Sequence, residues 1–175
     1  MELYIERGFE QTTVAEIAAR AGLTARTFFR YFADKREVLF GGSASLQELL
    51  VAALEGAPDA ASPMEAVAAA LDEAAAVLGQ GREYSRKRQS VIAANAELRE
   101  RELIKMASLG AALADGLRRR GVADPIASLA AEAGIVVFRV AFGSWVTDPE
   151  DQDLSRIMRE TLDQLTALRA EVKEP

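Results

Sequence analysis

The stretch TARTFFRYFADKRE (24–37) gathers arginine, threonine and aromatic side chains into one short segment. Its first thirteen residues hold four basic side chains and one acid, a local net charge of +3. Guanidinium groups donate paired hydrogen bonds to guanine or phosphate, and threonine methyls and aromatic edges suit thymine. These residue types therefore fit recognition of a double-stranded nucleic acid.

Helical geometry divides these side chains between two faces. At about 100° per residue, Phe28 and Phe32 lie about 40° apart and share one face, which we predict to be the inward one. Phe29 and Tyr31 are about 160° apart, so they lie on opposite flanks of the helix. The opposite face is made of Arg26, Thr27 and Arg30.

The elements around this segment have the spacing of a helix-turn-helix. Helices predicted at 14–21 and 25–32 are separated by the tight turn AGLT. Thr13 stands three positions before a glutamate, which is the pattern of a helix-capping box. Gly22 suits the left-handed conformation of the turn, and we expect Leu23 to plug it from inside.

The composition of the whole chain limits the classes of function. The 175 residues are 50% hydrophobic and 27% charged, which is ordinary for a globular protein. The net charge of −6 lies entirely after residue 40, because the first forty residues balance to zero. The chain has no cysteine and no histidine, so thiolate and imidazole chemistry are excluded. We expect no enzyme activity, no metal site and no cofactor.

Membrane and export signals are weak. The N-terminal MELYIERGFE lacks the apolar core of a signal peptide. The most apolar run, GIVVFRVAFGSWV, is interrupted by Arg139 and is shorter than a membrane span of about 18 residues. We expect a cytoplasmic protein with no membrane partner.

Helix signals recur along the chain and strand signals do not, so we predict an all-α fold. A natural division lies near residue 41, between three short helices and a bundle of longer ones. The predicted helices cover 2–7, 14–21, 25–32, 35–55, 63–78, 82–94, 96–120, 125–146 and 152–171.

The segment RGFEQTTVAEIAARAGLTARTFFRYFADKREVL (7–39) resembles the DNA-binding domain of TetR-type transcriptional regulators. The resemblance rests on Gly-Phe before paired threonines, on IA..AG, and on T.F.RYF..K. It implies a helix-turn-helix DNA-binding domain at 1–41 and a helical ligand-binding and dimerisation domain at 42–175. Family members carry a longer first helix, so we expect in-frame codons upstream of Met1 to extend it.

The resemblance also implies roles for individual residues. Thr13 would touch backbone phosphate, and Arg26, Thr27 and Phe29 would read base edges. Tyr31 and Lys35 would clamp phosphates. The full set of expected DNA contacts is Thr13, Thr24, Arg26, Thr27, Phe29, Arg30, Tyr31 and Lys35.

In the second half, the apolar helix 125–146 would pack in a homodimer and border a ligand cavity. The last helix carries regularly spaced apolar residues that would complete the dimer interface, or alternatively form an intramolecular core: Leu154, Ile157, Met158, Leu162 and Leu165. The predicted pocket lining, with an ordinary core as the alternative, is Tyr84, Met106, Phe138, Arg139, Phe142 and Trp145. Arg139 would either meet an anionic ligand or pair with an acid such as Glu132 or one on the partner chain.

The function implied by the resemblance is a ligand-responsive transcriptional regulator. It would act as a repressor that a small-molecule effector releases from a near-palindromic, double-stranded DNA operator. The alternative is a helical protein-interaction module without DNA binding. A helical enzyme has less support, because the chain lacks Glu-x-x-His pairs and G-x-S-x-G.

Overall fold

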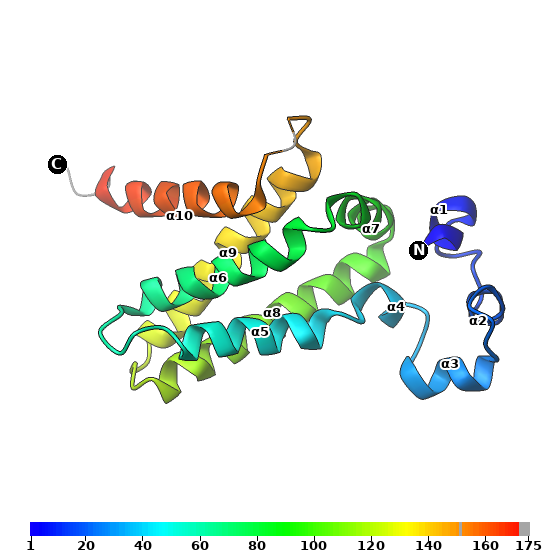
Figure 1. Ribbon diagram of the computed structural model, residues 1–175, viewed down its shortest axis with the longest axis horizontal. Helices are drawn as coiled ribbons and strands as arrows, with labels where there is room; N and C mark the ends of the chain where they lie inside the picture. The colour runs from blue at the N-terminus through cyan, green and yellow to red at the C-terminus, as the bar shows by residue number, and fades with distance from the viewer. Residues whose placement is uncertain (151, 172–175) are drawn as a thin grey trace.

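The computed structural model describes residues 1–150 and 152–171, and within them every regular element is a helix (Figure 1). The predicted all-α class is confirmed. The elements are α1 (Glu2–Arg7), α2 (Val14–Arg20), α3 (Ala25–Tyr31), α4 (Glu37–Phe40), α5 (Ser43–Glu55), α6 (Pro63–Gly79), α7 (Arg82–Ala94), α8 (Ala96–Arg119), α9 (Ile126–Thr147) and α10 (Leu154–Glu171).

The single helix predicted at 35–55 is wrong, because the chain divides it at Gly41-Gly42 into α4 and α5. Two adjacent glycines carry the largest backbone entropy cost of any helical pair, and they break the regular hydrogen bonding. The start of α4 is organised by Asp34, whose Oδ1 accepts hydrogen bonds from the backbone nitrogens of Arg36 (2.8 Å) and Glu37 (3.3 Å).

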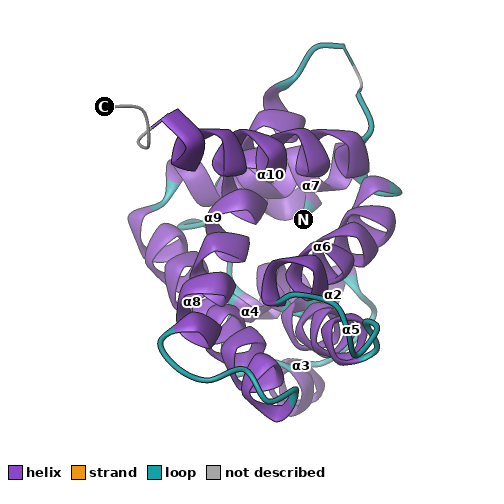
Figure 2. Cartoon of the chain, turned by 90° about the vertical axis from the view of Figure 1, so that its left-hand side faces the viewer, coloured by secondary structure: helices purple, strands orange, loops and turns teal. Residues whose placement is uncertain are grey.

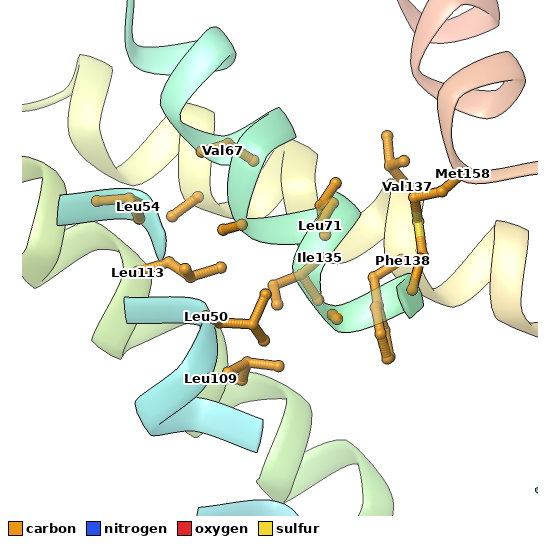
Figure 3. Close-up of a cluster of buried hydrophobic side chains, with 14 of the residues drawn as sticks. Leu50, Leu54, Val67, Leu71, Leu109, Leu113, Ile135, Val137, Phe138 and Met158 are labelled. Atoms are coloured by element: carbon orange, nitrogen blue, oxygen red, sulfur yellow. The ribbon is translucent and has the colours of Figure 1, made fainter. Parts of the chain in front are cut away.

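Five long helices, α5, α6, α8, α9 and α10, form the body of the molecule around one apolar core (Figures 1 and 2). In Figure 3, Leu50 and Leu54 of α5 point toward Leu109 and Leu113 of α8. Alanines fill much of α6, which contacts α5, α9 and α10, so these helices approach closely. At the α6–α9 crossing this approach depends on Gly134.

A second core joins the body to the head, by which we mean residues 1–36. It contains apolar residues from α1 and the following turn, from α4, and from α7 and α8: Tyr4, Phe9, Leu39, Phe40, Val91, Ile92 and Leu98. This second core contains residues from both sides of the division predicted at residue 41, so that division does not separate two cores. In Figure 1 the head lies at one end of the molecule, with α4 and α7 between it and the body.

Two segments, Glu37–Glu55 and α9, are long and apolar enough by length and composition to cross a membrane. The sequence expectation that no segment approaches this limit is wrong. However, α9 contacts α6, α7, α8 and α10, and ten of its residues are buried. A core helix of a bundle has this same composition, so we interpret α9 as one.

The α6–α9 crossing gives a stability prediction. A Cβ at position 134 would lie 2.5 Å from Cγ1 of Val67, a fully buried side chain that is stiff about χ1. We expect Gly134→Ala to lower the free energy of unfolding by about 1 kcal/mol or more, since overpacking outweighs the better helix propensity of alanine. Urea denaturation followed by circular dichroism measures this.

The matched control is Gly79→Ala at the end of α6, where a Cβ would meet only Leu154 Cβ at 4.0 Å. This variant should be at least as stable as the parent. Adding Val67→Ala to Gly134→Ala should recover part of the loss. Equal stability of the two glycine variants would contradict close packing of Gly134 against Val67.

Candidate nucleic-acid interface

The helix-turn-helix forms through local capping. Thr13 Oγ1 accepts a hydrogen bond from Glu16 N (3.3 Å), and the Glu16 carboxylate accepts one from Thr13 N (2.8 Å). Thr24 caps α3 in the same way, by accepting from Thr27 N (3.2 Å). The predicted turn is confirmed at Gly22, whose φ is +68°. These caps fix where α2 and α3 begin.

We expected Leu23 to fill the inside of the turn, but it does not. Its side chain is 46% exposed. The turn is closed instead by its backbone, because Leu23 N donates to the carbonyl of Ala18 (2.8 Å).

The aromatic residues of α3 divide as helical geometry predicts. Phe28 is buried and Phe32 is half-buried, and their ring centroids lie 5.2 Å apart. Phe29 and Tyr31 are 58% and 66% exposed. Exposed rings of this size stand out on a short helix, since a large apolar surface usually has a partner.

The basic residues of α3 also point outward. Arg26 is exposed and has no carboxylate partner among the described residues. Arg30 donates through Nη2 to Tyr31 Oη (3.1 Å), and its guanidinium lies 4.9 Å from the centroid of the Tyr31 ring. Arg30 and Tyr31 therefore form one stacked unit at the surface. Thr27 is half-buried, and its hydroxyl lies 3.1 Å from that of Thr24.

Most other cations of the head are neutralised within the chain. Arg7 pairs with Glu16 at 2.7 Å. Arg20 pairs with two carboxylates of α1, and Arg36 with Asp34 and with Glu97 of α8. Of the three arginines in TARTFFRYFADKR, only Arg26 and Arg30 thus lack a carboxylate partner in this part of the structure.

The side chain of Lys35 is bound to the backbone of the turn between α1 and α2. Its ammonium donates to the backbone carbonyls of Phe9 (2.8 Å), Glu10 (3.1 Å) and Thr12 (3.1 Å). An ammonium has three N–H donors, so these carbonyls use all of them. In the absence of DNA, Lys35 is thus engaged with the turn between α1 and α2, and its phosphate contact stays a prediction.

An ion-pair junction attaches α4 to the body, and sequence reasoning missed it. The Glu37 carboxylate accepts from Arg101 Nε (2.7 Å) and Lys105 Nζ (3.2 Å) of α8. Burial alone would raise the pKa of Glu37, but the hydrogen bonds from these two cations hold it below its usual range. More than sixty residues separate the partners, so no local pattern indicates the pairing.

The helix α7 supplies a second attachment. Arg88 Nε donates to the Leu39 carbonyl (2.7 Å), and the guanidinium lies 4.9 Å from the Phe40 ring centroid. Burial lowers the pKa of Arg88, while Glu102 of α8 opposes that shift at 3.3 Å. At its other end α7 holds the end of α9, where Arg82 donates to the Trp145 carbonyl (2.9 Å).

The predicted pocket residues are only partly brought together. Phe138 and Phe142 form a stack with ring centroids 5.7 Å apart, and the tilted Trp145 ring lies 5.6 Å from that of Phe142. Phe138 and Trp145 are buried in the main core, while Met106 and Phe142 are half-buried against it. The stack agrees with the alternative of an ordinary core.

Tyr84 and Arg139 lie on the surface. Tyr84 is 53% exposed, and Arg139 is exposed with no carboxylate partner among the described residues. The pairing of Arg139 with Glu132, one of the alternatives, is not formed, and the Glu132 carboxylate lies beside Gly110 of α8 instead.

The predicted dimer residues are mostly internal. Leu154, Ile157 and Met158 are buried in the main core, and Leu162 and Leu165 are half-buried against it. The burial of the first three agrees with the alternative of an intramolecular core.

A row of exposed apolar side chains lies on α9. Its residues are spaced three, seven and four positions apart along one side of the helix: Ile126, Leu129, Val136 and Val140. We call this the α9 stripe. Its spacing was visible in the sequence, but α9 is apolar on nearly all sides, so the sequence did not show which side is free.

The chain matches two family models. Residues 1–40 match that of bacterial regulatory proteins of the tetR family, and residues 61–170 match the MftR C-terminal domain. A stretch of 83 residues is 40% identical to the HTH-type transcriptional regulator TcmR of Streptomyces glaucescens. This match covers 47% of the chain and 35% of TcmR, about a third of that protein's length.

Solved structures share the fold. The TetR-family regulator PfmR from Thermus thermophilus aligns with a TM-score of 0.52 and 23% identity, over 94% of this chain and 92% of PfmR. The repressor FadR of the same organism, in complex with lauroyl-CoA, aligns with a TM-score of 0.58 and 24% identity, over 95% of this chain and 89% of FadR. The family models cover the head and most of the body, so the chain belongs to the TetR family of bacterial regulatory proteins.

Proposed function

We propose that this protein is a dimeric transcriptional repressor that binds a near-palindromic operator and releases it when a small molecule binds the body. The observation that carries the proposal is the two-sided character of α3. Its inner side is anchored by Phe28, while Arg26 and the Arg30–Tyr31 unit stand outward without acidic partners among the described residues.

We propose that α3 enters the major groove, which is about 12 Å wide and admits one helix. Arg26, Thr27 and Phe29 would then face base edges, with Arg26 suited to paired hydrogen bonds with guanine. Arg30 and Tyr31 would bind phosphate together, because their stacking orders both side chains before DNA arrives. Thr13 and Thr24 would lie near the backbone at the starts of α2 and α3.

A second copy of the chain is the proposed partner of the α9 stripe. Leu129 and Val140 are 66% and 53% exposed, and Leu168 on the neighbouring α10 is 61% exposed. Two such helices from each copy would form a four-helix interface, as in isologous dimers. A dimer of this kind would present two α3 helices to successive major grooves on one side of the operator.

The proposed route from effector to DNA passes through α7 and α4. Arg82 and Arg86 of α7 donate to carbonyls at the end of α9, and Arg88 donates to the Leu39 carbonyl of α4. A ligand that shifts α7 or α8 would therefore pull on α4 and turn the head. FadR was solved with lauroyl-CoA, which supports a small-molecule effector for this fold, and Met106 and Phe142 stay the candidate lining.

Binding of DNA is tested with labelled duplexes enriched from random sequence on the wild-type protein. We expect Arg26→Ala to weaken binding to the enriched duplex by about 10- to 100-fold, the cost of one lost base contact. Fluorescence anisotropy measures the affinity. The control is Arg119→Ala, which removes the same charge at the far end of α8 and should bind like the parent.

If no duplex is enriched, or if binding is independent of salt, the repressor proposal fails. A helical module that docks on another protein would then be the better interpretation, because release of counterions from phosphate is specific to nucleic acid.

Assembly is tested by a charge in the α9 stripe. Val140→Asp should raise the dimer dissociation constant at least about ten-fold, because a buried carboxylate in an apolar interface is costly. Analytical ultracentrifugation measures the change. Leu103→Asp on α8, where the side chain is 59% exposed, is the matched control and should dimerise normally. Equal effects of the two substitutions would place the interface elsewhere.

The junction at Glu37 predicts a pH dependence. Its pKa in the folded protein is lowered, so the carboxylate stabilises the fold above its unfolded pKa of about 4.3 and loses that effect as the pH falls through the folded value. At pH 7, Glu37→Gln should therefore be less stable than the parent by about 1–2 kcal/mol. Below about pH 4 the difference should shrink.

Urea denaturation at pH 7 and pH 3 makes this comparison. Glu83→Gln is the control, because Glu83 forms an exposed pair with Lys87 and should contribute little at either pH. If the stability difference for Glu37→Gln stays constant across this pH range, the charge of Glu37 does not stabilise the fold.

A further inference from the structure

The helix α9 carries one charge of each sign and pairs neither of them within its own chain. Glu132 and Arg139 are the only charged residues between Ile126 and Thr147. Both side chains are exposed, and neither forms an ion pair among the described residues. They are seven positions apart, about 10.5 Å along the helix, whereas ion pairs on one helix form at three or four positions.

Both charges lie on the same flank of the α9 stripe. Seven residues turn a helix by about 700°, about 20° short of two full turns, so Glu132 and Arg139 nearly share a line along the helix. Relative to Val136 they lie about 40° and about 60° to the same side. They therefore border the exposed apolar side chains and can reach a partner that covers the stripe.

The arginines of the neighbouring α10 differ from Arg139. Arg156 pairs with Glu160 in the next turn (2.7 Å), and Arg159 lies 3.3 Å from Asp72 of α6. Each of these two arginines thus has a carboxylate in its own chain. Arg139 has none among the described residues, so it is the better candidate for a carboxylate of another molecule.

A second row of seven-residue spacing differs in size instead of charge. Leu129 is 66% exposed and Val136 is 43% exposed, while Gly143 has no side chain. A Cβ at position 143 would meet nothing within 4 Å in its own chain. The packing of the chain therefore does not require glycine there, although alanine is more favourable within a helix. Gly143 leaves room on the stripe for a large side chain from outside.

We propose that two copies of α9 pack antiparallel about a two-fold axis at Val136, and that Glu132 of each copy pairs with the partner's Arg139. This rests on the proposed dimer. Residues equally far from the axis, on either side of it, meet across it. Glu132 and Arg139 lie four and three positions from Val136, and Leu129 and Gly143 each lie seven positions from it.

This axis gives two ion pairs and sets each Leu129 against the partner's Gly143. It runs between the two helices and at right angles to both, so each flank of one helix faces the same flank of its partner. The opposite charges therefore meet. An axis centred elsewhere would cover both charges without a partner, which is costly in an apolar interface. The two charges thus select the register of the dimer.

The experiment uses two full-length variants, Glu132→Lys and Arg139→Glu, each alone and in an equimolar mixture. Each variant alone would replace two attractive pairs by two repulsive ones, so we expect its dimer dissociation constant to rise at least about ten-fold. A mixed dimer would contain one pair of the original polarity and one of reversed polarity, both attractive. The mixture should therefore dimerise with about the affinity of the parent. Analytical ultracentrifugation measures all three.

Glu83→Lys on α7 is the control, because it changes the net charge as Glu132→Lys does and should dimerise like the parent. Recovery in the mixture also excludes misfolding, since two misfolded chains would not restore the dimer. If either charge variant alone dimerises like the parent, or if the mixture shows no recovery, the proposed register is overturned.

The size row gives an independent measurement of the same axis. Gly143→Leu should raise the dimer dissociation constant about ten-fold, because two leucines would then compete for one space. Adding Leu129→Ala to the same chain should recover part of that loss. No recovery would mean that residues 129 and 143 do not meet across the axis.

Val140→Asp separates this inference from the dimer on which it rests. If Val140→Asp weakens the dimer while the charge variants do not, the α9 stripe remains the interface and the register at Val136 fails. If the wild-type protein is monomeric, or if Val140→Asp dimerises normally, the interface and the register both fail.

Discussion

The attachment of the one-turn helix α4 to the body is the constraint on which the orientation of the head depends. Four residues cannot form a stable helix alone, because nucleation fixes several dihedral angles for very few hydrogen bonds. α4 persists because Leu39 and Phe40 are buried in the second core. Its ends are held by Glu37, which binds two cations of α8, and by Arg88, which binds the Leu39 carbonyl.

Charge in the head is arranged around that attachment. Arg36 pairs with Glu97 of the body, and Lys35 is enclosed by backbone carbonyls, so both cations serve the internal structure. Arg26 and Arg30 are left to face an outside partner. A protein with a net negative charge can thus bind an anionic partner such as DNA, since only the contacting face has to carry positive charge.

Much of the helix-turn-helix was predictable because its determinants are local. The caps at Thr13 and Thr24, the turn at Gly22 and the inward side of Phe28 each depend on residues a few positions apart. Lys35 is the exception within this segment. The carbonyls that accept from its ammonium lie more than twenty residues earlier, beyond the reach of a local pattern.

The sequence by itself determined the helical class, most helix positions and the two-sided character of α3, since periodicity and capping operate over one or two turns. Tertiary structure alone decided which apolar side of each long helix is covered. Leu154 and Met158 are internal because α6 and α9 enclose them, while Val136 and Val140 are free because no described helix of this chain lies over them. Burial is a property of neighbours in space, and on a helix that is apolar on nearly every side no spacing reveals where they stand.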